Sequence, residues 1–329
     1  MSPLVSIGIP TYNRSRLLRQ AITSVLRQSV QDFEIIVSDD CSTDDTAEVV
    51  ERFGDARLRY HRTATNLRPP RNWNECARLA HGAFFALLPD DDVWCPEFLA
   101  EMVTTFQAHP DVGFVQCAYR SVDEQLREIR TVQASVTELV LRGESALIWH
   151  MQHLACVPVA VLFRRAAMVE LGLWREDYWD DWAFIVRMAY RYGSVFIPPP
   201  LACSRVHGEN LSRRLFTERR DAILDLYNQQ TDVFAQALPA TPALIALRAK
   251  LIRELSHHCV LLTLGALRRR QWAQARFHWT RARQFHAWAG FDPGFIALRL
   301  TLRGETQRLR QLQHDAQRKT PLFDWAATL

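Results

Sequence analysis

Three consecutive aspartates, Asp90, Asp91 and Asp92, directly follow an apolar run and come shortly before a Pro-led helix start at Pro96. Carboxylates this close repel one another, and without a cation or hydrogen-bond donors each raises the pKa of its neighbours. Hard oxygen ligands of this kind suit Mg²⁺ or Mn²⁺ bound jointly with substrate phosphates. Such an ion would also neutralise a diphosphate leaving group. The alternative is a solvated acidic turn that caps the following helix.

The triplet ends one unit of a repeating pattern, in which short β-rich runs alternate with amphipathic segments over the first 120 residues. This alternation predicts an open, mainly parallel sheet flanked by helices on both faces, an α/β fold. The expected strands are 4–9, 33–38, 56–62, 83–88 and 111–119, and the expected helices are 16–28, 43–53, 72–82 and 95–109.

Polar residues follow the predicted strands at the points where open parallel sheets bind their ligands. They are PTYNR (10–14), DDCSTDD (39–45), TNLRPPRN (65–72) and the acidic triplet. This clustering predicts a nucleotide site. The sequence has no GxGxxG or GxxxxGK[ST] loop, which argues against dehydrogenases and P-loop enzymes.

The rest of the chain follows two other patterns. Residues 121–212 read as α+β, and residues 213–329 read as helical, with apolar residues at helical spacing. The chain has 329 residues, of which 48% are hydrophobic, enough to fill a core. Seven scattered cysteines without a CxxC pair argue against a disulfide framework or a zinc cluster and favour the cytoplasm. We expect neither a secretory signal nor a transmembrane helix.

Charge is distributed unevenly along the chain. Residues 213–329 contain 19 Lys and Arg against 9 Asp and Glu, a net +10, whereas residues 1–212 contain 21 against 27, a net −6. The basic region, which includes Trp272, Trp279 and Trp288, suits contact with anionic lipid headgroups at the inner face of the plasma membrane. The alternative is a helical bundle that packs on the N-terminal region or on a second subunit. Nucleic acid is not an expected partner, since no groove-reading module is present.

Residues 4–212 resemble the family 2 glycosyltransferases, which have the nucleotide-sugar-binding A-type fold. The resemblance rests on VSIGIPTYNRSRLLRQAITSVLRQSVQDFEIIVSDDCSTDDT, on NLRPPRNWNECARLAHGAFFALLPDDDVWCPEFL, and on DDWAFIVRMAYRYG followed by SRVHGENLS. It implies an inverting, metal-dependent transfer from a nucleoside-diphosphate sugar to a glycan or lipid-linked acceptor in surface polysaccharide biosynthesis. It also implies a catalytic domain over 1–212, divided into a nucleotide-sugar half (1–120) and an acceptor half (121–212).

The resemblance implies roles for the residues after the first two strands. Thr11 and Tyr12 would line the base, and Arg14 would lie near it. Asp39 would accept a hydrogen bond from the base imide, with Asp40 beside it. The alternative for the two aspartates is a turn into the next helix.

Further along the chain, Arg71 would approach the diphosphate and Asp90 would face the ribose or the metal. Asp91 matches the residue that binds the metal in the family, and Asp92 would support the metal site. His207 matches a ligand of Mn²⁺ or Mg²⁺ that comes late in the sequence. Pro89 stands where the D-x-D-D form of the motif has its first aspartate. An ordinary half-buried histidine is the alternative for His207.

Transfer to a hydroxyl needs a base that takes its proton as the nucleotide leaves. Asp181 occupies the position of the catalytic base of the family, and Asp180 is the second candidate. The alternative is an N-cap cluster for the following helix. His150 and His153 are further candidates for the edge of the acceptor pocket.

Two other functions remain open from the sequence. A nucleotidyltransferase acting on sugar phosphates would need a basic, Gly-rich phosphate loop, and PTYNRSR contains no glycine. A non-catalytic nucleotide-binding relative would have no need for clustered acidic side chains.

Overall fold

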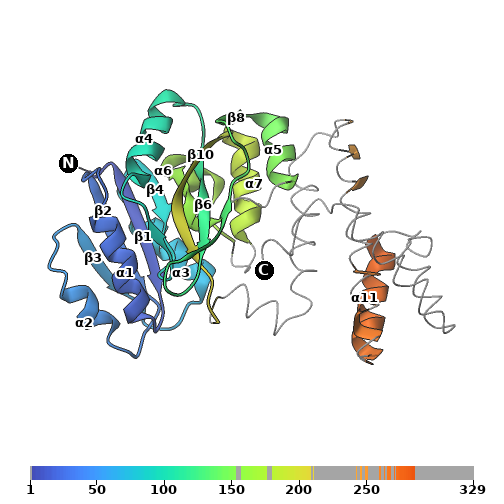
Figure 1. Cartoon of the computed structure of the whole chain (residues 1–329), viewed down its shortest axis with the longest axis horizontal. Coiled ribbons are helices and arrows are strands. Elements are labelled where there is room, and N and C mark those ends of the chain that lie inside the picture. The colour runs from blue at the N-terminus through green and yellow to red at the C-terminus, as the bar shows by residue number, and fades with distance from the viewer. Residues whose placement is uncertain are drawn as a thin grey trace. The chain divides into compact units, whose positions relative to one another are not determined.

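The computed structural model describes residues 2–152, 157–175, 180–208 and 210, together with scattered positions between 242 and 285. The chain divides into two compact units, Met1–Val233 and Phe234–Leu329. The sheet and the helices that cover it belong to the first unit, and helix α11 (Trp272–Phe285) belongs to the second (Figure 1). The domain boundary at 212 stays a prediction.

The first half of the sheet is parallel, in the order β3-β2-β1-β4. Its strands are β1 (Val5–Thr11), β2 (Phe33–Asp39), β3 (Leu58–Arg62) and β4 (Phe84–Leu87). Every residue of β1 and β2 is buried, as expected of parallel strands covered on both faces. Thr11 lies opposite Asp39 in the register, so the loops after β1 and β2 leave the sheet side by side.

The second half of the sheet is mixed, in the order β4-β9-β6-β10-β5. Its strands are β5 (Val93–Trp94), β6 (Phe114–Val122), β7 (Glu128–Val132), β8 (Leu139–Leu141), β9 (Val161–Arg164) and β10 (Ser194–Arg205). β9 runs antiparallel to both β4 and β6, β10 runs parallel to β6, and β5 pairs antiparallel with β10. This last pairing brings the segment after the acidic triplet against the strand that leads to His207.

Helices cover both faces of the sheet, as the sequence predicted (Figure 1). One core packs α1 (Ser15–Leu26), α2 (Thr46–Glu51) and α4 (Phe98–Ala108) on the sheet. The other packs α3 (Pro69–Leu79), α5 (Gly143–Gln152), α6 (Arg165–Leu171) and α7 (Asp180–Tyr192). A 3₁₀ turn at Pro158–Ala160 adds Val159 and Ala160 to the first core. Successive residues of β2 point to opposite faces, so Ile35 and Val37 join the first core and Ile36 the second.

Helix α3 approaches β1 very closely because Gly8 has no side chain. A Cβ atom at Gly8 would lie 2.5 Å from the Cβ of Cys76. The start of α3 is fixed by Asn72, which accepts a hydrogen bond from Ser38 Oγ (2.6 Å) and donates one to the Ser38 carbonyl (2.9 Å). The loop before α3 is thereby held at the carboxyl end of β2.

In the second unit, α11 buries Ala275, His278 and Ala282, which share one helix face. Trp272, the first residue of α11, is 65% exposed. Trp288 lies outside the described residues. Among the helices that the structure describes, none combines the length and the apolar character that crossing a bilayer requires.

Candidate active site

The loops after β1 and β2 are tied together by Asn13, which the sequence reasoning did not single out. Asn13 has a left-handed backbone (φ 53°), a conformation that asparagine tolerates better than most residues. The backbone amide of Asn13 donates a hydrogen bond to Ser42 Oγ (2.9 Å), and its side-chain Oδ1 accepts one from the backbone amide of Thr43 (2.7 Å). Of the two residues that precede it, Tyr12 is 46% exposed and Thr11 is buried.

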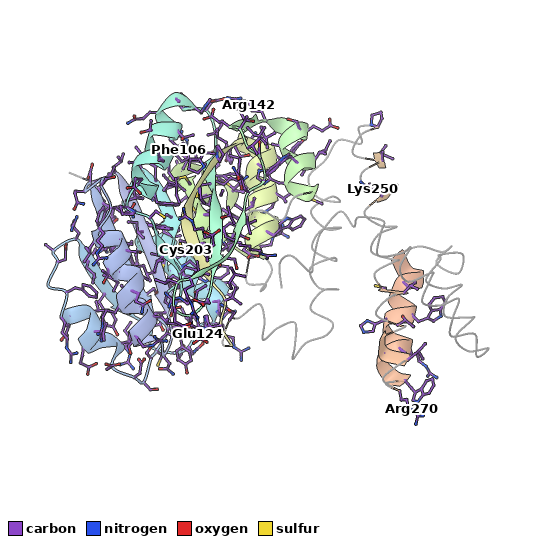
Figure 2. All side chains as sticks on the ribbon, viewed as in Figure 1. Phe106, Glu124, Arg142, Cys203, Lys250 and Arg270 are labelled. Atoms are coloured by element: carbon purple, nitrogen blue, oxygen red, sulfur yellow. The ribbon has the colours of Figure 1, made fainter. Side chains whose placement is uncertain are left out.

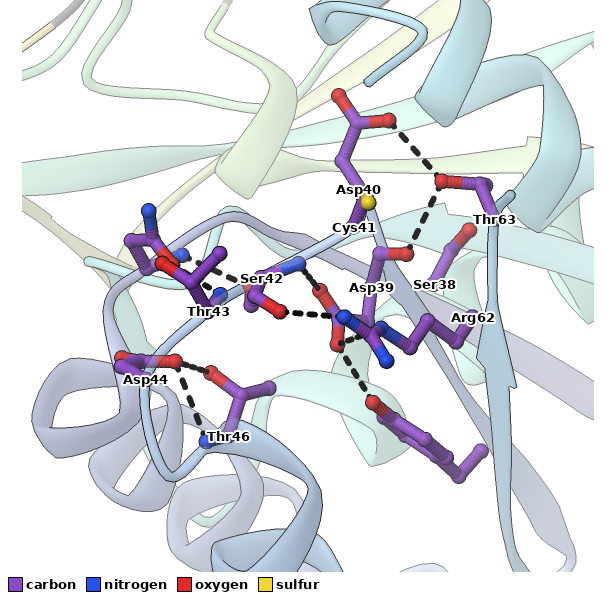
Figure 3. Close-up of polar contacts among 12 residues, drawn as sticks. Ser38, Asp39, Asp40, Cys41, Ser42, Thr43, Asp44, Thr46, Arg62 and Thr63 are labelled. Carbon is purple, nitrogen blue, oxygen red and sulfur yellow. Dashed lines mark hydrogen bonds and ion pairs between the residues drawn. The ribbon is translucent and has the colours of Figure 1, made fainter. Parts of the chain in front are cut away.

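Asp39 is buried within a set of neutral and cationic donors at the end of β2 (Figure 3). Its Oδ1 accepts the Ser42 amide (2.9 Å), and its Oδ2 accepts the Tyr60 hydroxyl (2.5 Å). Arg62 Nε lies 3.8 Å from the same Oδ2. Asp39 therefore organises the turn between β2 and α2, the alternative that the sequence left open, and each oxygen keeps lone-pair capacity for a further donor.

Asp40 points away from Asp39 toward the loop before α3 (Figure 3). Its two oxygens accept the backbone amides of Leu67 (2.6 Å) and Arg68 (2.9 Å), and Thr63 Oγ1 lies 3.3 Å from Oδ1. Asp40 thus fixes the shape of the loop that leads into α3.

The acidic triplet lies between β4 and β5. The Arg14 guanidinium is the positively charged partner of its first two carboxylates. Arg14 Nη1 is 3.1 Å from Asp90 Oδ1 and 3.0 Å from Asp91 Oδ2. Thr11 Oγ1 donates to Asp90 Oδ2 (2.8 Å). The sequence placed Thr11 and Arg14 at the base, and it did not indicate these contacts with the triplet.

The segment that ends β10 closes the other side of the triplet. His207 Nε2 is 2.9 Å from Asp91 Oδ2, and the backbone amide of Arg205 donates to Asp92 Oδ1 (2.7 Å). Asn210 Oδ1 accepts the His207 amide (2.6 Å), and Asn210 Nδ2 lies 3.4 Å from Asp91 Oδ2. Asn210 was missed, although it lies in the SRVHGENLS stretch, because only the histidine of that stretch was weighed as a ligand.

The three carboxyl groups have different affinities for protons. Burial, together with the charge on Asp91, raises the pKa of Asp90 to about 6 and raises the pKa of Asp92. Burial acts in the same direction on Asp91, but the hydrogen bond with His207 and the charge of Arg14 outweigh it and lower the pKa of Asp91. Asp91 is therefore the most strongly anionic member of the triplet, which is the property a metal ligand needs.

The chemistry of this group fits a divalent cation. Asp91 and His207 adjoin each other, and the neighbouring carboxylates of Asp90 and Asp92 are hard oxygen donors. Within the described part of the chain, no three His, Cys, Asp or Glu side chains already form a metal-binding group. Because Asp91 Oδ2 is held by Arg14 and His207, a cation at this oxygen would compete with the Arg14 contact.

Arg71 and Asp181, the predicted diphosphate ligand and catalytic base, each lie in the first turn of a helix. Arg71 is exposed in the first turn of α3. Asp181 is half-buried in the first turn of α7, where its Oδ1 accepts the Trp182 amide (2.8 Å). His150 is buried, with Nε2 2.8 Å from Ser194 Oγ. His153 and the side chain of Asp180 lie outside the described residues.

Comparison with known proteins identifies the family. The family model of Glycosyl transferase family 2 matches residues 6–172, about half of the chain. The chain belongs to glycosyl transferase family 2. The predicted family and fold class are therefore confirmed.

Curated relatives of this family 2 glycosyltransferase match it over different lengths. An uncharacterized protein of Mycobacterium tuberculosis is 28% identical over 67% of the chain and 73% of its own length. The putative colanic acid biosynthesis glycosyl transferase WcaA of Escherichia coli is 37% identical over 33% of the chain. A GalNAc(5)-diNAcBac-PP-undecaprenol beta-1,3-glucosyltransferase of Campylobacter jejuni is 37% identical over 34% of the chain. The matches span 38% and 36% of the latter two proteins.

Solved structures resemble the chain in fold. TarS of S. aureus, in complex with UDP-GlcNAc, is 18% identical with a TM-score of 0.55 and covers 86% of this chain and 92% of its own. The mannosyltransferase PcManGT of Pyrobaculum calidifontis, in complex with GDP-Man and Mn²⁺, is 18% identical with a TM-score of 0.50 and covers 88% of each chain. These glycosyltransferases show the same mixed α/β architecture.

Proposed function

We propose that this family 2 glycosyltransferase moves a sugar, with inversion, from a nucleoside-diphosphate sugar to a glycan or lipid-linked acceptor in surface polysaccharide biosynthesis. The observation that carries the proposal is Asp91, buried and anionic, held by Arg14 and His207 beside the loops that follow β1 and β2. The named relatives support the acceptor class, since one acts in colanic acid biosynthesis and another on an undecaprenol-linked glycan.

The donor nucleotide would occupy the edge formed by β1 and β2. Thr11, Tyr12 and Asp39 would hold the base, with Asp39 accepting the imide proton through its remaining lone pairs. Asp40 would keep the loop before α3 in shape, and Arg71 at the start of α3 would approach the diphosphate.

Asp91 and His207, supported by Asp92, would hold Mn²⁺ or Mg²⁺. When bound, such an ion would neutralise the negative charge of the departing diphosphate. The contacts of His207 and Arg14 with Asp91 lower its pKa and so favour the ionised form that a metal ligand needs. Asp90, held by Thr11, would border the ribose or the ion.

Asp181 would take the proton of the acceptor hydroxyl as the bond to the sugar forms on the face opposite the leaving group. Asp181→Asn should lower kcat by at least ~100-fold and leave donor affinity unchanged, because a positioned general base contributes roughly 10² to 10⁴ in rate. Initial-rate kinetics and calorimetric donor binding would measure both quantities. Asp180→Asn is the matched control, and a larger loss in that variant would move the role to Asp180.

Thermal denaturation with UDP, GDP and dTDP, each with and without Mn²⁺, tests the function directly. A ligand at 100 times its Kd stabilises a protein by about 2.7 kcal/mol, so the matching nucleotide should raise Tm by several degrees only with the metal. Chelation should reverse the effect. Much stronger stabilisation by nucleoside triphosphates would favour the nucleotidyltransferase, and no stabilisation by any nucleotide would contradict a donor site.

We also propose that the basic residues of 213–329 bring the enzyme to the inner face of the plasma membrane. Vesicles containing anionic lipid should sediment with the full chain, and raising the salt concentration should release it. Equal co-sedimentation with neutral vesicles would contradict this part of the proposal.

A further inference from the structure

Two cysteines that are distant in sequence, Cys95 and Cys203, meet on one face of the sheet edge. Cys203, labelled in Figure 2, lies opposite Val93 in the antiparallel pair of β10 with β5. Cys95 comes two residues after Val93 and therefore lies on the same face. The Cys95 amide continues the ladder by donating to the Leu201 carbonyl (2.8 Å). The two side chains are close enough to form a hydrogen bond, Cys95 Sγ also lies 3.7 Å from the Pro200 carbonyl oxygen, and both thiols are half-buried.

A cation adjoins this pair. Arg120 lies opposite Cys203 in the parallel register of β6 with β10, and its Nη1 is 3.3 Å from Cys95 Sγ. The hydrogen bond with Cys203, together with Arg120 and against the effect of burial, lowers the pKa of Cys95 to about 6. The same hydrogen bond and burial raise the pKa of Cys203. These two shifts favour a thiolate at Cys95 and a protonated thiol at Cys203.

The other described cysteines offer no comparable arrangement. Cys76, Cys117 and Cys259 are buried, and burial raises the pKa of both Cys76 and Cys117. Cys41 is half-buried like Cys95, and its Sγ lies 3.9 Å from the Ala64 carbonyl. Since reactive cysteines lie in partly exposed, electropositive surroundings, Cys95 is the reactive position among them.

We propose that Cys95 and Cys203 form a peroxide-sensitive thiol pair. The Cys95 thiolate attacks one peroxide oxygen, which breaks the O–O bond and gives a sulfenic acid and hydroxide. The Cys203 sulfur then attacks the Cys95 sulfur, the S–O bond breaks, and the departing hydroxide takes up the Cys203 proton as water. In sum, peroxide is reduced to water and the two thiols are oxidised to a disulfide.

The disulfide would act on the acidic triplet. Diagonal positions of an antiparallel pair are about 7–8 Å apart, slightly beyond the Cα separation of most disulfides, so closure must pull Cys95 toward Cys203. Cys95 lies three residues after Asp92 in the sequence. Cys203 lies two residues before Arg205, whose backbone amide donates a hydrogen bond to Asp92. Resting on the proposed function, we infer that oxidation lowers the affinity for the metal and the nucleotide.

The chemical test treats the reduced full chain with equimolar hydrogen peroxide, followed by alkylation, digestion and mass spectrometry. A peptide pair joined through Cys95 and Cys203, and released by a thiol reductant, is the expected result. In Cys203→Ser, the sulfenic acid should persist at Cys95 and be captured by dimedone. Joining of a different cysteine pair, or oxidation of Cys41 with Cys95 left reduced, would overturn the proposal.

Arg120→Gln separates activation by the cation from mere exposure of the thiol. The pH at which iodoacetamide alkylates Cys95 at half its maximal rate should move from about 6 toward the ~8.5 of an ordinary thiol. Arg130→Gln, at an arginine on the neighbouring β7, is the matched control and should leave this pH unchanged. An unchanged value in Arg120→Gln would overturn the role of the cation.

Control of the donor site is measured separately. Peroxide should weaken metal-dependent nucleotide binding at least ~10-fold in the wild-type chain and leave it unchanged in Cys95→Ser, which cannot form the disulfide. A disulfide between Cys95 and Cys203 without loss of affinity would overturn this control. Absence of nucleotide binding in the reduced chain would instead contradict the proposed function.

Discussion

Two groups of buried aspartates lie at the same edge of the sheet, but different kinds of donor hold them. Asp39 and Asp40 accept three backbone amides, from Ser42, Leu67 and Arg68, in addition to the hydroxyls of Tyr60 and Thr63. The triplet after β4 depends instead on the side chains of Arg14, Thr11 and His207, with one backbone amide at Asp92. Residue type and burial are alike in the two groups, so the donors distinguish them.

The difference in donors predicts a difference in function. A backbone amide is fixed by the fold and cannot leave its acceptor without distorting the loop, so Asp39 and Asp40 suit a rigid frame. A guanidinium can turn away when a stronger cation arrives, and an imidazole can bind that cation itself, so the triplet suits exchange of partners. The raised pKa values of Asp90 and Asp92 agree with this, because their charges are incompletely compensated.

The largest expected effect comes from Asp91→Asn. Metal-dependent nucleotide affinity should fall at least ~100-fold, since removing a ligand should cost no less than removing a residue that supports one. The Tm of the metal-free chain should fall, because the lowered pKa of Asp91 means that its charge stabilises the fold through His207 and Arg14. Calorimetric titration and thermal denaturation measure the two quantities, with the exposed Asp45→Asn as control. Equal affinity in the variant would place the metal elsewhere.

Asp40→Ala should mainly lower the stability of the fold, whereas Asp91→Asn should mainly lower nucleotide affinity. Two backbone amides lose their acceptor, which costs about 1–3 kcal/mol and lowers Tm by several degrees. Asp45→Ala, in the same loop region but exposed, should change the unfolding free energy by about 0.5 kcal/mol at most. Denaturant titration would measure both variants. A stable Asp40→Ala chain that has lost only nucleotide affinity would break the distinction between frame and exchange site.

The smallest effect is the pH dependence of stability in the presence of a chelator. The folded pKa of Asp90, about 6, exceeds the unfolded value near 3.9, so its contribution to stability is lost as the pH rises between these values. Asp44 has the opposite sign. Partial burial is outweighed by hydrogen bonds from Thr46 and from the Ser15 amide, which lower its pKa, so its contribution is lost as the pH falls below about 4. Asp90→Asn should flatten the first slope only, and an unchanged profile would contradict the assignment.

Much of the fold could be predicted because it depends on local patterns. The run 33–38 became β2, and the helical periods became α1, α3 and α4. The rule that ligands lie beyond the strand ends also brought together the loops after β1, β2 and β4. The antiparallel insertion of β9 could not be predicted, because an apolar run does not indicate the direction of its strand.

Contacts within the site were harder to predict than its position. Arg14 reaches the triplet only because β1 and β4 are neighbours, and this depends on strand order. Asn210, like Arg14, is far in sequence from Asp91, although its Nδ2 lies close to Asp91 Oδ2 in the fold. The roles of Arg71 and Asp181 stay predictions, since they depend on a bound substrate.

The way in which Asp40 holds the loop before α3 has a consequence for sequence divergence. Its partners are the main-chain amides of positions 67 and 68, which every amino acid except proline possesses. Leucine at position 67 could be exchanged for almost any residue while the anchor persists, whereas position 68 has a backbone φ of 71°, which favours glycine and disfavours β-branched residues. A saturation library should therefore show tolerance at position 67 interrupted by proline alone, preference for glycine at position 68, and few accepted replacements at position 40 itself.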